Sequence, residues 1–334
     1  DTKMEFSATA GTAGGSLKAL FEVRDGDNLE NFKGKVTKAD SYSLTVENTS
    51  IDNIKSLNLP DKDGKITVNN ISYSYDSWEA QVDAQGNIKS VTFNLSKDKA
   101  IADPEKTVAE GYLLNAGSAI NARGIPYYMT QLNEFVRNFS EMFNQIESKG
   151  QNLNGDTPPT FFEAITNTAK VYDFSESEAY SKLPDGQTAT INSSSNTYYR
   201  MTAANFSVNK DVMNDVSLFA TATDYVKTDS CDIVDELKKL QSEKTVYRGD
   251  KAESFLETII SNVSVDTEKA ETYNKLYSNL EQTIANQRTS VSGVDEDEEA
   301  LNLVKFQYSY NMASKIISVM NQMLDKLIND TGVA

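Results

Sequence analysis

The last helical segment of this chain is the feature that most constrains its fold. No glycine or proline interrupts residues 295–329, and a helix of that length would reach about 50 Å. Its apolar residues recur every three or four positions in two adjacent stripes. The first stripe is Leu301, Val304, Tyr308, Met312, Ile316, Val319, Met323 and Leu327. The second stripe is Leu303, Phe306, Tyr310, Ala313, Ile317, Met320, Leu324 and Ile328.

Two apolar stripes predict two sets of neighbours, because a surface helix of a globular protein usually buries only one face. Covering all of these positions would be worth about 20–40 kcal/mol as an upper bound. A central helix of a compact bundle would also satisfy the pattern. A membrane-surface helix is disfavoured, because the polar face is not rich in lysine or arginine. The residues expected to form an assembly interface are Leu301, Leu303, Val304, Phe306, Gln307, Tyr310, Ala313, Ile316, Ile317, Met320, Leu324 and Leu327.

The composition excludes several classes of function. With 49 acidic and 32 basic side chains the net charge is −17, which repels nucleic acid. The chain has no histidine, and therefore no Ser-His-Asp triad or histidine-liganded zinc. Cys231 is the single cysteine, and no run approaches the roughly 18 apolar residues of a membrane span. We predict a folded acidic protein that is not an enzyme, with no cofactor, no bound metal, no nucleic-acid partner and no membrane span.

The remaining pattern predicts an α+β protein. Helical spacing is expected over residues 14–25 and 126–149, and again over 250–263 and 267–288. Alternation with a period of two favours a small β domain over residues 35–98.

Two turn signals lie within the β segment. Residues 61–64 and 83–87 carry the Asp, Gly or Asn that hairpin turns need. A calcium loop starting at Asp61 is disfavoured, because its twelfth position is Ser72 instead of a glutamate. Trp78 is expected to be a core residue, and its exposure would instead favour a glycan-binding surface.

An acidic run precedes the terminal helix. Asp295, Asp297, Glu298 and Glu299 follow Ser292 and Gly293. Acidic side chains in a first helical turn are stabilised by the helix dipole, and an aspartate caps well. We therefore interpret these six residues as a helix-capping motif, and hold a metal or acid–base cluster as the weaker alternative.

Residues 290–310 resemble the C-terminal signature of the flagellar hook-associated protein 1 family, S-V-S-G-V-N-x-D-E-E-A-x-N-L followed by an aromatic-Gln pair and a tyrosine. Residues 290–293, 297–300, 302, 303, 306, 307 and 310 match it, and Asp295 replaces the usual asparagine. Residues 14–25 resemble the family's G-G-x-L helix, and residues 139–155 resemble the helix and loop that follow.

The resemblance implies an elongated multidomain rod of long helices, with a coiled-coil-like terminal helix and inserted β-rich outer domains. The expected division is listed here by residue number: a helical core segment at 1–26, an inserted β-rich domain at 27–122, a helical core segment at 123–155, a mixed β-rich segment at 156–210, a helical core domain at 211–294 and a terminal assembly helix at 295–334. The chain begins at Asp1 without an initiator methionine or a signal-peptide pattern, so we expect it to lack the N-terminal half.

The resemblance also implies partners and a location. The subunits would form a ring joining hook to filament outside the cell, after export by the flagellar type III apparatus. Expected partners are other copies of the chain, hook protein, hook-associated protein 3 or filament-side subunits, and an export chaperone at the C-terminal region. Another axial protein of the hook or rod remains an alternative. An enzyme or glycan-binding module in the inserted domain is a less favoured one.

Overall fold

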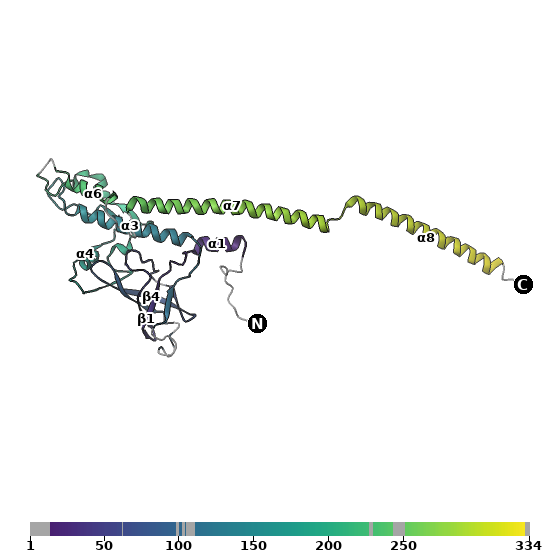
Figure 1. The fold of residues 1–334 in the computed structure, drawn as a ribbon, viewed down its shortest axis with the longest axis horizontal. Helices are drawn as coiled ribbons and strands as arrows, with labels where there is room; N and C mark the ends of the chain where they lie inside the picture. Colours follow the sequence, from purple (N-terminus) through teal and green to yellow (C-terminus); the bar gives the residue numbers. More distant parts are fainter. Residues whose placement is uncertain are drawn as a thin grey trace. The chain divides into compact units, whose positions relative to one another are not determined.

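The computed structural model describes residues 14–61, 63–97, 100–101, 104, 111–226, 230–242 and 251–330. The predicted segments at 1–26 and 295–334 therefore lie partly outside the described residues. The chain divides into two compact units, residues 1–261 and 262–334. Helices and strands both occur, which confirms the predicted α+β class (Figure 1).

The first unit contains a closed antiparallel sheet. Its strands are β1 (Lys33–Asp40), β2 (Ser43–Glu47), β3 (Gly64–Val68), β4 (Ile71–Val82), β5 (Ile88–Leu95), β6 (Leu113–Ala116) and β8 (Ala189–Asn192). Their order is β3-β6-β1-β2-β5-β4-β8, and β3 pairs with β4 as well as with β6. The first six strands therefore form a ring. β8 joins from outside the predicted 27–122 segment by pairing with the second half of β4.

Alternating side chains fill the interior of this ring, as the period-two pattern predicts. Trp78, Tyr75, Phe93 and Leu44 are fully buried. The Trp78 indole meets the ring of Tyr199 edge to face, with 5.0 Å between the centroids. The expectation that Trp78 is a core residue is confirmed. The glycan-binding alternative required an exposed indole, and this indole is buried.

One of the two predicted hairpin turns is confirmed. Residues 83–87 connect β4 to β5, and the Asp83 carboxylate accepts hydrogen bonds from the backbone N–H groups of Gln85 and Asn87. The prediction for residues 61–64 was wrong. Gly64 is the first residue of β3, and the β3–β4 hairpin turns at Asn69 and Asn70, whose φ angles are 50° and 62°. Gly64 is needed for close approach, because a Cβ there would overlap the ring of Tyr75.

Helices and a two-stranded sheet complete the first unit. They are α1 (Ser16–Asp25), α3 (Ile125–Glu147), β7 (Phe162–Ala164), α4 (Ser175–Ser181), β9 (Phe206–Val208), α5 (Lys210–Asn214) and α6 (Asp232–Ser242). The predicted helices at 14–25 and 126–149 correspond to α1 and α3. Gly26 and Gly124 lie where the chain leaves α1 and enters α3, and a Cβ on either would overlap the other's backbone. The chain therefore leaves α1 for the sheet and returns from the sheet to α3 at the same place.

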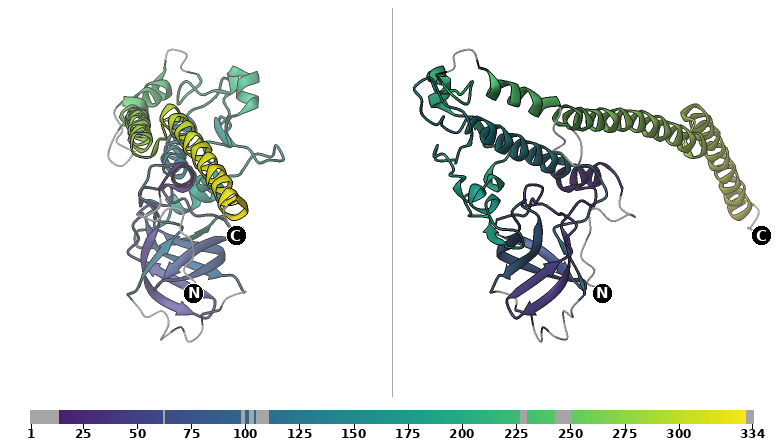
Figure 2. Two further views of the ribbon diagram at one scale, coloured as in Figure 1. Left: turned by 90° about the vertical axis from the view of Figure 1, so that its right-hand side faces the viewer. Right: turned by 60° about the vertical axis from the view of Figure 1, so that its left-hand side comes forward.

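The apolar positions of α3 are not its most buried ones. The sequence pattern is that of a buried stripe, made of Met129, Leu132, Phe135, Phe139, Met142 and Ile146. Of these six residues Ile146 is buried and the other five are partly buried. The buried positions are mainly polar: Gln131, Asn133, Glu134, Arg137, Asn138, Ser140, Glu141, Asn144 and Glu147. Figure 2 shows α3 running alongside the loops above the sheet. The backbone carbonyls of those loops need hydrogen-bond donors. The loops therefore pack against the polar face of α3, which supplies them.

Two long helices follow. α7 (Ala252–Ser292) and α8 (Glu296–Asp330) have 41 and 35 residues. The two separate helices predicted at 250–263 and 267–288 are one continuous helix. The apolar spacing changes near residue 265 because the surroundings of α7 change along its length. Phe255 and Ile259 are buried in the first unit, whereas the residues beyond Ser261 belong to the second. No glycine or proline interrupts the backbone, and the Thr267 hydroxyl donates to the Val263 carbonyl within the helix.

Candidate assembly interface

The predicted interface residues all lie on α8, and none of them is buried. The ten large apolar members are between 46% and 76% exposed, with Val304 and Tyr310 at the two ends of that range. Gln307 and Ala313 are also exposed. Spacing of three or four places the second stripe, from Leu303 to Leu324, on one helix face. An uncovered apolar surface of this extent is typical of an interaction site.

The part of α7 in the second unit carries a further apolar set, which the sequence prediction did not include among the interface residues. Tyr273, Leu276, Tyr277, Leu280 and Ile284 are each about half exposed or more. Their spacing was visible in the sequence and was interpreted only as a helix. The exposed apolar surface of residues 262–330 is therefore larger than α8 alone provides.

The start of α8 is capped by a side chain. The Asp295 carboxylate accepts hydrogen bonds from the backbone N–H groups of Asp297 and Glu298, at 3.0 and 3.3 Å. Asp297, Glu298 and Glu299 occupy the first turn, where the helix dipole favours negative charge. Ser292 is the last residue of α7, and its hydroxyl donates to the Arg288 carbonyl at 2.8 Å. The Gly293 N–H donates to the Thr289 carbonyl, which closes α7.

The described residues offer neither a cluster of metal ligands nor a membrane-spanning helix. Among the described residues, no group of three or more Cys, Asp or Glu side chains is placed to hold a metal ion. None of the helices in the described part of the chain combines the length and the apolar character that crossing a membrane requires.

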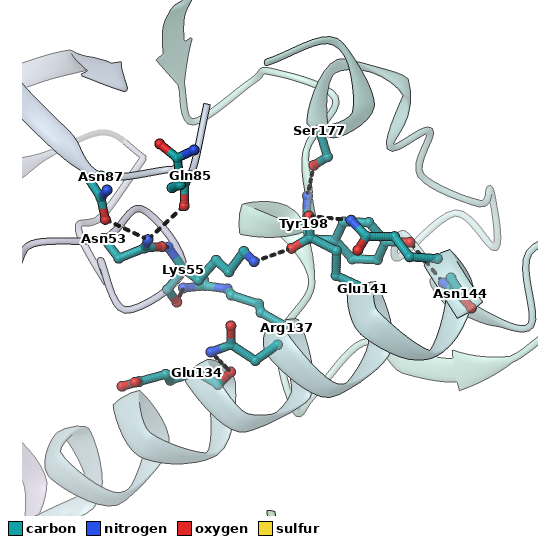
Figure 3. A network of polar contacts seen from close by, with 12 residues as sticks. Asn53, Lys55, Gln85, Asn87, Glu134, Arg137, Glu141, Asn144, Ser177 and Tyr198 are labelled. Carbon is teal, nitrogen blue, oxygen red and sulfur yellow. Dashed lines mark hydrogen bonds and ion pairs between the residues drawn. The ribbon is translucent and has the colours of Figure 1, made fainter. Parts of the chain in front are cut away.

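A polar network attaches α3 to the sheet in the first unit (Figure 3). The guanidinium of Arg137 donates to the backbone carbonyls of Lys55, Leu57 and Met201 at 3.0, 2.7 and 2.9 Å. It also lies over the ring of Tyr199, 4.5 Å from the centroid. Burial lowers the pKa of Arg137. The aromatic ring and the three carbonyls replace the hydrogen bonds that the guanidinium would make to water. One side chain thus joins three segments that are distant in sequence.

Two further polar residues extend this network along α3. The carboxylate of Glu141 pairs with the Lys55 ammonium at 2.7 Å. Asn144 donates to the Tyr198 hydroxyl and to the Phe162 carbonyl, and it accepts from the Phe162 N–H. Spacing of three or four residues places Arg137, Glu141 and Asn144 on one face of α3, where they hold the sheet and the 156–210 segment to the same helix.

The opposite face of α3 is only partly covered. Phe255 and Ile259 of α7 pack against Leu132, Phe135 and Phe139. An apolar groove of about 500 Å³ remains beside them. It is lined chiefly by Phe135, Phe139, Phe143, Leu237, Leu256 and Ile260. This face of α3 therefore keeps an open apolar groove beside the start of α7.

Two comparisons find flagellar proteins that are similar to this chain. Residues 285–330, which contain α8 and the capping residues, match the family described as "Flagellar basal body rod FlgEFG protein C-terminal". The whole chain is 21% identical over 341 aligned residues to flagellar hook-associated protein 1 of Bacillus subtilis (strain 168). The chain spans 56% of the length of that relative. The resemblance to hook-associated protein 1 noted in the sequence is thus confirmed over the full chain, with the rod-protein match centred on its terminal helix.

Proposed function

We propose that this chain is the C-terminal portion of a structural subunit of the flagellar axis, an adaptor that joins hook to filament by polymerising through α8. One observation carries the proposal: the segment that matches the rod-protein family is also the segment whose apolar residues are uncovered. A helix exposed in this way is stable in a working protein only when other helices cover it.

The assembled form we propose is a ring of copies of this subunit on an elongated rod. The terminal helix, residues 295–334, would form the inner assembly element, and the closed sheet would lie in an outer domain. The proposed core segments are 1–26, 123–155 and 211–294, with β-rich segments at 27–122 and 156–210. The relative is longer than the region matched here, and we propose that a corresponding N-terminal half supplies the helix that pairs with α8.

The remaining partners follow from the same proposal. Hook protein would contact the ring on one side, and hook-associated protein 3 or filament-side subunits on the other. An export chaperone would cover the C-terminal region before the subunit leaves the cell by type III export. Coupled folding on assembly suits such terminal segments, since the cost of ordering is met by new contacts. The role is structural, and we propose no catalytic chemistry for it.

The experiment expresses the intact protein in a flagellated bacterium from which its own copy has been deleted. One variant carries Ile317→Asn and Leu324→Asn on the second stripe of α8. Its matched control carries Ser318→Asn and Asp325→Asn, the neighbouring polar positions. We expect the stripe variant to reach the medium but to form no hook–filament junctions by electron microscopy, and the control to form filaments normally. A deletion of residues 301–334 should also abolish junctions. Normal filaments in the stripe variant would refute the proposal.

A further inference from the structure

A second site lies in the first unit, away from α8. A cavity of about 260 Å³ opens between α3, β7 and the segment that contains α4. Its walls include Glu141, Asn144, Glu163, Asp173, Phe174 and Tyr198. Figure 3 shows three of these lining residues, Glu141, Asn144 and Tyr198, close together beside α3. The volume is several times the roughly 30 Å³ that a water molecule occupies in the liquid, so the cavity has room for a small organic group.

The walls of the cavity are acidic. Three carboxylates line it, and the lining, which lies wholly within the described residues, contains no lysine or arginine. Two of the carboxylates already have partners. Glu141 pairs with Lys55, and Asp173 accepts hydrogen bonds from the backbone N–H and the hydroxyl of Ser175. For the third carboxylate, Glu163, the described residues supply no hydrogen bond or ion pair.

Glu163 is the unusual member of the lining. It sits in the middle of β7, opposite Ser207 of β9, and is only 5% exposed. Within the described part of the chain its carboxylate makes no hydrogen bond or ion pair. Burial, and secondarily the charge of Asp211, raise its pKa, while Lys210 lowers it. A carboxylate on a side chain this enclosed is costly without a hydrogen bond or an ion pair, and a cation bound in the cavity would reduce that cost.

Aromatic rings form another part of the wall. Phe174 and Tyr198 stack with their centroids 4.3 Å apart, and both line the cavity. Flat aromatic surface next to a carboxylate suits a cation that carries a planar or apolar part, because the ring face attracts positive charge. A guanidinium or an alkylammonium has that character, whereas a hydrated metal ion does not.

We propose that this cavity binds an organic cation, a guanidinium or primary ammonium group, which pairs with Glu163 and lies against the rings of Phe174 and Tyr198. The group could come from a free amine or from a lysine or arginine side chain of a partner protein. The two sources share this chemistry, and they are separated by the choice of probe.

The probe is agmatine, which carries both cationic groups, titrated into the full chain by calorimetry at pH 7.5. We expect a dissociation constant near 1 mM. Glu163→Gln should weaken binding at least about tenfold, as expected for loss of a charge-assisted contact. The control Glu176→Gln changes an exposed carboxylate of α4 outside the cavity and should leave binding unchanged. Phe174→Leu, which keeps the carboxylate, should weaken binding by a smaller factor. Fluorescence of Trp78 checks that each variant is folded.

Nα-acetyl-arginine amide identifies the source. Binding as tight as that of agmatine supports a partner's side chain, and binding of agmatine alone supports a free amine. The proposal is overturned if agmatine binds Glu163→Gln as tightly as the parent chain, or if no binding is detected up to about 20 mM, well above the expected constant. Tighter binding of Mg²⁺ than of agmatine at the same site would overturn the assignment to an organic cation.

Discussion

Arg137 provides the most direct test of how the sheet is attached to α3. Replacing it with methionine keeps most of the side-chain volume and removes the guanidinium. The backbone carbonyls of Lys55, Leu57 and Met201 would then lose their donor. The cation–π contact with Tyr199 would also be lost.

The expected loss follows from these contacts. Hydrogen bonds that involve a charged group contribute about 1.5–3 kcal/mol each, but burying the guanidinium is itself costly, as its lowered pKa reflects. Removing the guanidinium leaves buried carbonyls without their donor, at about 1–3 kcal/mol for each unsatisfied group. Because the cost of burying the charge is relieved at the same time, we expect Arg137→Met to lower the free energy of unfolding by about 3–5 kcal/mol in total. Arg137→Lys keeps the charge without the fork of donors and should cost about 2 kcal/mol.

Urea unfolding measured by tryptophan fluorescence is the appropriate assay. Trp78 is the single tryptophan of the chain, and it contacts the same Tyr199 ring that Arg137 covers. Arg24→Met is the matched control. Arg24 is exposed, pairs with its neighbour Asp25 and lies over the ring of Phe21 on the same helix, so its replacement should change stability by less than about 0.5 kcal/mol. A loss below about 1 kcal/mol for Arg137→Met, or a lysine variant equal to the parent, would refute the reasoning.

Three further predictions concern single positions. Burial raises the pKa of Glu147 to about 7. Between about pH 4.5 and 7 the folded state therefore keeps a proton that the unfolded state releases, and stability falls as the pH rises through that range. Glu147→Gln should raise the free energy of unfolding by up to about 3 kcal/mol at pH 8 and leave it unchanged near pH 4, and an equal gain at both pH values would contradict this assignment. Gly64→Ala should cost about 2–3 kcal/mol in urea unfolding, because the new methyl group meets the Tyr75 ring, whereas Gly14→Ala, which meets open space, should change nothing. Asp295→Ala should cost the first turn of α8 about 1 kcal/mol, seen as faster amide exchange at residues 297–300, and Ser292→Ala should leave that exchange unaltered.

The sequence by itself determined the elements whose signal is local. The 35-residue terminal helix follows from an uninterrupted apolar repeat, and the turn at 83–87 follows from the residues it needs. The burial of Trp78 was expected from its large apolar ring. The alternation of Tyr73 and Tyr75 would place Trp78 on the other face of β4, and the bulge between Tyr75 and Ser77 turns it into the core. The sequence also identified the chemical character of the predicted interface, because the spacing of apolar side chains by three or four residues on α8 can be recognised without any distant segment.

Tertiary structure decided what depends on segments far apart in the chain. The polar face of α3 is buried because loops at 55–57 and 198–203 place their carbonyls against it, which no local pattern encodes. The break expected near residue 265 is instead a change of surroundings along one continuous helix. Neither the addition of β8 to the sheet nor the enclosure of Glu163 could be predicted from the sequence. Helical and strand periods are properties of neighbouring residues, whereas burial is a property of the residues that come to cover them.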